Sequence, residues 1–124
     1  METKQPFKSI RPFIGAKDFD ESRNFYKELG FSELILLENL SYFKVDEKLG
    51  FYLQAAYVKD WVDNSMLFLE VDNLEAYLLE LKSKKLTEKF SRIRISDIEV
   101  KNWGKVFFLH DPSGILWQIG CFNS

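Results

Sequence analysis

Residues Trp103 to Ile119, WGKVFFLHDPSGILWQI, contain two apolar runs on either side of the turn tetrapeptide 111–114, Asp-Pro-Ser-Gly. Proline presets the backbone for a turn, aspartate can accept a hydrogen bond from the backbone two residues on, and glycine tolerates φ above zero. The stretch therefore predicts a β-hairpin with a fixed register. Because successive strand residues alternate in direction, Leu116 and Gln118 should share the face opposite to Trp117.

A glutamine among large apolar residues indicates a lined cavity in preference to a plain core. The alternative is that Gln118 faces solvent on an edge strand.

Composition bounds the class of protein. The chain has 124 residues, of which 46% are hydrophobic and 16% aromatic, enough for a single domain, 1–124, with one core. Seventeen basic residues stand against 19 acidic ones, and only Lys82, Lys84 and Lys85 cluster, so no nucleic-acid partner is expected. No apolar run approaches the roughly 20 residues of a membrane span, so no membrane partner is expected either.

The ends of the chain add two expectations. The opening residues 1–5 lack the apolar core of a signal peptide, which predicts a cytoplasmic protein. The single cysteine, Cys121, has no partner for an internal disulfide, and its apolar surroundings favour a small buried hydrophobe over a nucleophile.

The first half of the chain predicts one strand, one helix and three further strands. Residues 8–16 form a β-branched and aromatic run, and Asp18 followed by Glu21 is typical of a helix start. Gly30 provides the stop, so residues 19–29 should be helical. Polar turns then separate three extended segments, 31–38, 40–46 and 49–55.

The second half repeats that order. A loop, 59–64, leads to a strand at 66–71, and Asp72 with Glu75 repeats the helix-start pattern before a helix at 73–84. A strand at 93–100 and the hairpin complete the set.

Two shifted comparisons of the chain with itself support an internal repeat. A shift that lays Arg11 on Met66 also lays Asp18 on Asn73. Residues 50–54 match residues 114–118 only with a larger shift, so the second unit carries extra residues, which the segment 87–103 would hold as a loop able to act as a flap. The predicted modules span about 8–56 and 65–122.

The segment 22–31, SRNFYKELGF, and Trp103-Gly104 followed by Asp-Pro-Ser-Gly at 111–114 resemble the glyoxalase/bleomycin-resistance/dioxygenase proteins, the vicinal oxygen chelate superfamily. The resemblance covers essentially the whole chain. It implies an α+β fold in which two β-α-β-β-β modules form a curled mixed sheet around a cleft, with the helices outside.

The metal enzymes of that superfamily place four ligands on the first and last strands of the modules. The resemblance puts these positions at Arg11, Gln54, Met66 and Gln118. None of the four is a histidine, a carboxylate or a thiolate, which are the side chains that bind such metal ions. We therefore expect no metal and no other cofactor.

Strand alternation then predicts which side chains line the cleft. Trp103, beside the motif glycine, is the best placed of the loop aromatics Trp61, Phe90 and Trp103 to stack on a flat ligand. The predicted ligand-binding residues are Arg11, Phe13, Tyr52, Gln54, Met66, Phe68, Glu70, Trp103, Leu116 and Gln118. The residues predicted to face the helices are Ile10, Ile14, Leu53, Leu67 and Trp117.

Arg11 is the chemically distinctive member of the predicted cleft. An unpaired buried guanidinium costs several kcal/mol, so Arg11 should meet either the Glu70 carboxylate or an anionic or carbonyl group of the ligand. The sequence leaves both alternatives open.

The pattern favours a metal-free protein that binds a small molecule, similar to the bleomycin-resistance branch that protects by sequestration. The alternative is a glyoxalase-like lyase or another small-molecule enzyme, with Glu70, His110 or Tyr52 as acid or base, although no two of these are predicted to pair. A third possibility is an interaction protein whose own side chains fill the cleft. The resemblance also implies a homodimer.

Overall fold

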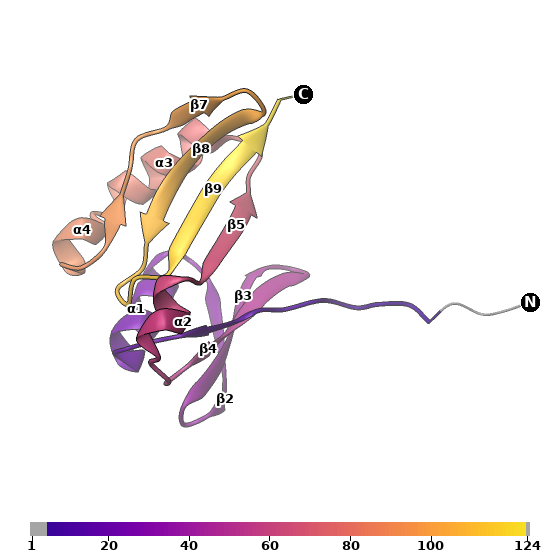
Figure 1. Ribbon diagram of the computed structural model, residues 1–124, viewed down its shortest axis with the longest axis vertical. Coiled ribbons are helices and arrows are strands. Elements are labelled where there is room, and N and C mark those ends of the chain that lie inside the picture. Colours follow the sequence, from indigo (N-terminus) through magenta and orange to yellow (C-terminus); the bar gives the residue numbers. More distant parts are fainter. Residues whose placement is uncertain (1–4, 124) are drawn as a thin grey trace, which may run out of the picture.

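The computed structural model describes residues 5–123, so the opening segment 1–4 lies outside the described residues. Its strands form two mixed sheets, called sheet A and sheet B here (Figure 1). In spatial order, sheet A contains β1 (Phe13–Gly15), β4 (Leu49–Gln54), β3 (Leu40–Asp46) and β2 (Ser32–Leu37). Sheet B contains β5 (Met66–Glu70), β9 (Leu116–Phe122), β8 (Gly104–His110) and β6 (Arg94–Ile95), and β7 (Glu99–Lys101) also pairs with β8. The helices are α1 (Phe19–Glu28), α2 (Lys59–Asp63), α3 (Leu74–Ser83) and α4 (Leu86–Lys89).

The two sheets share one topology. In sheet A the first strand, β1, runs parallel to the last strand, β4, and in sheet B β5 runs parallel to β9 in the same way. The remaining ladders are antiparallel. This arrangement confirms the predicted α+β class and the repeated β-α-β-β-β order.

Both main helices begin at an N-cap side chain, as expected from the sequence. The Asp18 carboxylate accepts a hydrogen bond from the Glu21 N–H at 3.0 Å. In α3 the cap is Asn73, whose side-chain oxygen accepts from the Ala76 N–H at 3.0 Å, so the prediction that Asp72 starts this helix is off by one residue. Such caps satisfy backbone donors that the first helical turn leaves unpaired.

The predicted hairpin is confirmed. Asp111 Oδ1 accepts hydrogen bonds from the backbone N–H groups of Ser113, Gly114 and Ile115, each at 2.9 Å. Gly114 has a φ of 104°, a value that favours glycine. The register across β8 and β9 places Phe108 opposite Gln118, so the alternation expected on β9 holds.

A buried polar centre, called the module junction here, joins the two halves of the chain and consists of Tyr26, Asp111 and Trp117. The Tyr26 hydroxyl donates to Asp111 Oδ2 at 2.6 Å and accepts from Trp117 Nε1 at 2.9 Å. Burial raises the pKa of the Asp111 carboxyl above its ordinary value, although its hydrogen bonds act in the opposite direction. Burial is also the main cause that raises the pKa of Tyr26 well above its ordinary value.

The predicted strand at 8–16 is much shorter in the structure. Only Phe13–Gly15 form the ladder with β4, to which the Pro12 carbonyl adds one hydrogen bond from the Tyr52 N–H at 2.9 Å. The preceding residues form an extended arm that runs away from the body of the molecule (Figure 1). Pro6 and Pro12 have no backbone N–H to give to a ladder. As a result Ile10 is 98% exposed, and the prediction that it faces the helices is wrong.

Three segments of the second half also differ from expectation. The predicted loop 59–64 contains the short helix α2, whose Val62 is buried. The predicted strand 93–100 is divided into β6 and β7, because Ser96 Oγ accepts from the Phe108 N–H and interrupts the ladder. The extra residues at 87–103 are taken up by α4 and these strands, so no long flap is formed.

Two single-residue expectations also need correction. Phe90 is buried, with its ring edge-on to Phe25 at 5.4 Å between centroids, and is not available to a ligand. Cys121 is half-buried, where a fully buried side chain was expected.

Candidate ligand-binding site

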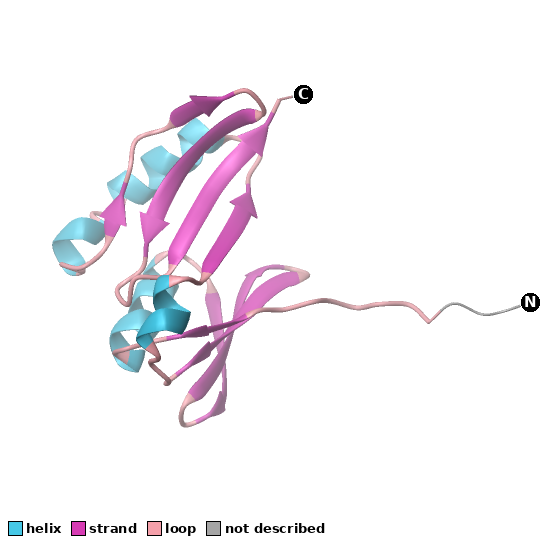
Figure 2. Cartoon of the chain, viewed as in Figure 1, coloured by secondary structure: helices cyan, strands magenta, loops and turns pink. Residues whose placement is uncertain are grey.

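Each sheet has one face packed on the core and one open face. The inner faces carry buried residues such as Ile14 and Leu53 in sheet A and Trp117 in sheet B, as predicted. Figure 2 shows α3 behind sheet B, whereas no helix covers the face of this sheet that is turned to the viewer. The open faces are therefore the surfaces on which a ligand or a partner can be held.

The open face of sheet A is an aromatic shelf. One cross-strand row consists of Phe13, Tyr52, Tyr42 and Leu34. Phe13 stacks on Tyr52 with 4.5 Å between ring centroids, and Tyr42 lies 5.3 Å from Tyr52. Gly50 makes room for the Tyr42 ring, since a Cβ there would come within 2.1 Å of the hydroxyl.

Arg11 lies on this shelf and has a partner that the sequence did not predict. Its guanidinium carbon is 4.3 Å from the centroid of Tyr42, and one N–H donates to the Tyr52 hydroxyl at 3.1 Å. That hydrogen bond is the main cause that raises the pKa of Arg11 above its ordinary value. Within residues 5–123 Arg11 forms no ion pair, so the alternative of an Arg11 to Glu70 pair does not occur.

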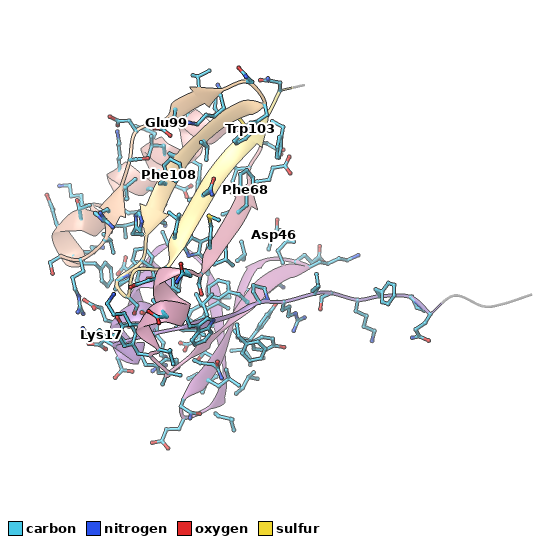
Figure 3. All side chains as sticks on the ribbon, in the orientation of Figure 1. Lys17, Asp46, Phe68, Glu99, Trp103 and Phe108 are labelled. Carbon is cyan, nitrogen blue, oxygen red and sulfur yellow. The ribbon has the colours of Figure 1, made fainter. Side chains whose placement is uncertain are left out.

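The open face of sheet B consists of cross-strand rows. The first row contains Met66, Leu116, His110 and Arg94, and the second contains Phe68, Gln118 and Phe108. Phe68, Trp103 and Phe122 form an aromatic cluster at one end of this face, with centroids 5.1 to 6.0 Å apart. Phe68 and Trp103 are labelled in Figure 3. Trp103 thus packs against a predicted ligand-binding residue.

An open groove of about 620 Å³ lies between the two sheets. Three of the predicted residues, Met66, Phe68 and Glu70, line it from sheet B. Leu67 and Leu69 of the same strand and Trp117 of β9 also line it, although Leu67 and Trp117 were expected to face the helices. The rest of the wall consists of Ile10, Pro12, Val45, Lys48, Leu49, Gly50, Phe51 and Asp72. A volume of this size is in the range of small-molecule sites.

The remaining predicted residues lie on the two open faces, outside this groove. Phe13, Tyr52 and Gln54 belong to sheet A, and Arg11 contacts this sheet from the arm before β1. Leu116 and Gln118 belong to sheet B, and Trp103 packs on Phe68 from the turn between β7 and β8. The sequence grouped them into one cleft, but in a single chain they occupy two surfaces.

The four positions of the superfamily metal site do not suit a metal ion here. The guanidinium of Arg11 is cationic and donates to Tyr52. Gln118 donates its amide N–H to the Met66 sulfur, and its neutral amide oxygen is the only metal-binding atom that this side chain offers. These side chains provide no charge to neutralise a divalent ion.

The candidate acid and base residues are also dispersed. Tyr52 lies on sheet A, and Glu70 and His110 lie near opposite edges of sheet B, on β5 and β8. No proton relay joins them in the described part of the chain. Burial, and then the charge of Arg94, lower the pKa of His110 below its ordinary value.

Sequence reasoning missed Tyr42, Leu34 and Arg94. Alternation along 40–46 would have placed Tyr42 on the same face as Tyr52, because both strands had been predicted correctly. Arg94 could not be found in this way, since it lies on a two-residue strand whose register depends on the interruption at Ser96.

Among residues 5–123, none of the helices has the length and apolar character needed to cross a bilayer. Comparison with models of protein families and comparison with curated protein sequences each gave no match.

Comparison with solved structures gave many matches over nearly the whole chain. A bleomycin-binding protein in complex with bleomycin is 24% identical, with a TM-score of 0.77, and the match covers 98% of this chain and 100% of that one. The bleomycin-binding protein of Streptomyces verticillus, in complex with copper(II)-bleomycin, is 16% identical, with a TM-score of 0.79 and coverage of 97% and 100%. Lactoylglutathione lyase from Agrobacterium tumefaciens is 18% identical, with a TM-score of 0.68 and coverage of 94% and 96%. The resemblance expected from the sequence is thereby confirmed at the level of the fold, which this chain shares with these bleomycin-binding proteins and with the lyase.

Proposed function

We propose that this protein is a single-domain, metal-free binding protein that sequesters a small molecule on its open sheet faces. The observation that carries the proposal is the apolar character of these faces around a groove of about 620 Å³. Met66 and Phe68 are 59% and 44% exposed, and Leu34 on sheet A is 58% exposed. Exposed apolar surface on each of the two open faces marks a binding surface.

The metal-free part of the proposal rests on the side chains at the four superfamily positions. An arginine, two glutamines and a methionine offer no imidazole, thiolate or carboxylate. The dispersion of Tyr52, Glu70 and His110 supports binding without catalysis, because acid–base chemistry needs its groups within reach of one substrate.

The proposal includes a homodimer. In one chain the aromatic shelf of sheet A and the open face of sheet B both remain uncovered, and two copies can bury both if each places its sheet A against sheet B of the other. Such an arrangement would unite the predicted ligand-binding residues in one cleft. We also propose that the protein is cytoplasmic, as the sequence predicts.

Two leucines offer a matched test of the dimer. Leu34 is on the shelf, whereas Leu79 is on α3 and is 69% exposed. We expect sedimentation at micromolar concentration to show a dimer for the wild type and for Leu79→Gln, and a shift toward monomer for Leu34→Gln. A monomeric wild-type protein would remove this part of the proposal.

Native mass spectrometry and a broad thermal-shift screen test ligand binding. We expect co-purified or added small molecules to bind without a metal, and Phe68→Ser to weaken the binding at least tenfold, because a buried aromatic contact contributes more than 1.4 kcal/mol. Leu79→Gln is the control that should retain affinity. Stoichiometric zinc, nickel or iron retained after dialysis and lost on Gln118→Ala would contradict the proposal.

A further inference from the structure

A small hollow at the outer edge of sheet B is distinct from the groove between the sheets. It has a volume of about 310 Å³, and its walls are Arg94, Ile95, Ser96, Phe108 and His110. None of these residues lines the larger groove. The hollow lies beside β6, at the opposite edge of the sheet from β5.

The sheet register brings together the Arg94 guanidinium and the ionisable ring of His110. Arg94 and His110 are direct cross-strand partners, so their side chains leave the sheet on the same face. The same row continues through Leu116 to Met66. Since neighbouring strands are about 4.8 Å apart, the row of four strands extends for roughly 14 Å, from a cationic end to an apolar end.

The positive charge at this edge has no counter-ion among the described residues. Within residues 5–123, Arg94 forms no ion pair and the His110 ring forms no hydrogen bond, whereas Arg92, two residues earlier, pairs with Glu21. The carboxylate next to His110, that of Asp111, is turned inward to Tyr26 and to the turn N–H groups.

We propose that the hollow at Arg94 and His110 binds an oxyanion, either a carboxylate or a phosphate, of an amphiphilic ligand whose apolar part lies along Leu116 and Met66. This inference rests on the proposed function, because it names the chemical class of ligand for the same open face. Arg94 presents a planar group with five N–H donors that can hold two oxygens of one anion. Ser96 does not compete, since its hydroxyl accepts from the Phe108 N–H and donates to the Asp97 carbonyl.

His110 gives the subsite a pH dependence. The groups that face its ring are Arg94 from β6 and the apolar Leu116 from β9, and together with burial the Arg94 charge keeps the pKa of His110 below its ordinary value in the free protein. A bound oxyanion favours the protonated ring and therefore raises this pKa. By linkage, protonation of His110 strengthens binding of the anion, so affinity increases as the pH falls through the His110 pKa.

A pair of matched probes tests the subsite: phenylbutyrate and its neutral analogue, phenylbutyramide. At pH 6 we expect the carboxylate to bind roughly tenfold more tightly than the amide, because a charge-assisted hydrogen bond replaces a neutral one. The difference should shrink at pH 8. His110 is the only histidine in the chain, so its ring resonances report its pKa without ambiguity, and this pKa should rise on saturation with the carboxylate.

Two neighbouring arginines provide variant and control. Arg94→Gln should remove the preference for the carboxylate and leave affinity for the amide unchanged, whereas Arg92→Gln should retain the preference. His110→Gln should abolish the pH dependence.

Equal carboxylate affinity in the wild type and Arg94→Gln, or a His110 pKa that does not move, would overturn the subsite. If the subsite is overturned in either way but the amide still binds, the proposed function is unaffected. Binding of neither probe also counts against the subsite, while the broad thermal-shift screen decides the proposed function separately.

Discussion

The two sheets have a similar strand order, but the arginines on their open faces have different surroundings. On sheet A, Arg11 stacks on Tyr42 and donates to Tyr52, so its charge already has aromatic partners. On sheet B, Arg94 lies beside His110, and no carboxylate of the described chain pairs with it. The repeated backbone therefore produces two surfaces of different chemistry, one aromatic with a partnered cation and one with an unpaired cationic edge.

A second comparison shows what the two faces retain in common. Each lays an aromatic ring over a glycine of its last strand, Tyr42 over Gly50 in sheet A and Phe68 over Gly120 in sheet B. At either glycine a Cβ would come within 3.0 Å of the ring or its hydroxyl. The backbone thus positions one ring on each face, and the residues around that ring decide what the face binds.

The largest expected effect comes from the module junction, on which any comparison of the two faces depends. Asp111→Ala removes the acceptor of the Tyr26 hydroxyl and of three turn N–H groups, all close to the buried carboxylate. Leaving two buried and two half-buried donors unpaired should lower the free energy of unfolding by on the order of 3–5 kcal/mol. Chemical denaturation measures this loss.

Asp97→Ala is the matched control for this substitution. The Asp97 side chain is almost fully exposed and, among the described residues, pairs only with Lys82, at 3.5 Å, so the change should stay within about 0.5 kcal/mol. Equal stabilities of the Asp111 and Asp97 variants would mean that the junction does not hold the two sheets together.

Much of the fold could be predicted because local signals and the register agree. The Asp-Pro-Ser-Gly turn, the Asp18 cap and the alternation of β9 each depend on residues close in sequence. The sequence predicts residues 8–12 as the start of a strand because their side chains suit one, but Pro12 lacks a donor and no neighbouring strand lies beside most of this segment.

The candidate site was harder to predict than the fold. Alternation correctly assigned Tyr52, Met66 and Phe68 to open faces, but the angle between two sheets is not encoded in any single strand. The sequence therefore combined both faces into one cleft. The partner of Arg11 was missed for a similar reason, since Tyr42 reaches it across the sheet over Gly50.

The second largest expected effect concerns the inner face of sheet B, which packs against α3. It should make the protein less stable at alkaline pH. Tyr77 on α3 packs against Phe107, and burial raises its pKa to about 12. Because the folded pKa exceeds the unfolded value of about 10, the contribution is complete below pH 10 and is lost as the pH rises toward 12. At pH 10.5 the penalty is on the order of 0.8 kcal/mol.

Tyr77→Phe removes this ionisable group. Relative to the wild type, its free energy of unfolding should decline less between pH 8 and pH 10.5, by about that amount. Tyr57→Phe is the control, because Tyr57 is exposed. Parallel pH profiles for the wild type and Tyr77→Phe would show that Tyr77 is not held in its neutral form by the fold.

The smallest expected effect distinguishes the two cations of the open faces. Arg11 already interacts with two tyrosines, so its removal should act on a ligand mainly through the shape of the shelf. The internal cation–π contact of Arg11 with Tyr42 is worth roughly 0.5–1 kcal/mol, which bounds its indirect effect on a ligand, so we expect Arg11→Ala to weaken phenylbutyrate binding by no more than about threefold. Titration calorimetry can compare this loss with the roughly tenfold loss expected for Arg94→Gln.

Arg11→Lys refines the same comparison. It keeps the positive charge but replaces the planar guanidinium that stacks on Tyr42 with a compact ammonium group. If the shelf geometry is what matters, Arg11→Lys should resemble Arg11→Ala in affinity and in its small loss of stability. Full recovery of affinity in Arg11→Lys would instead show that the charge of Arg11 contacts the ligand, and the two faces would then both bind anions.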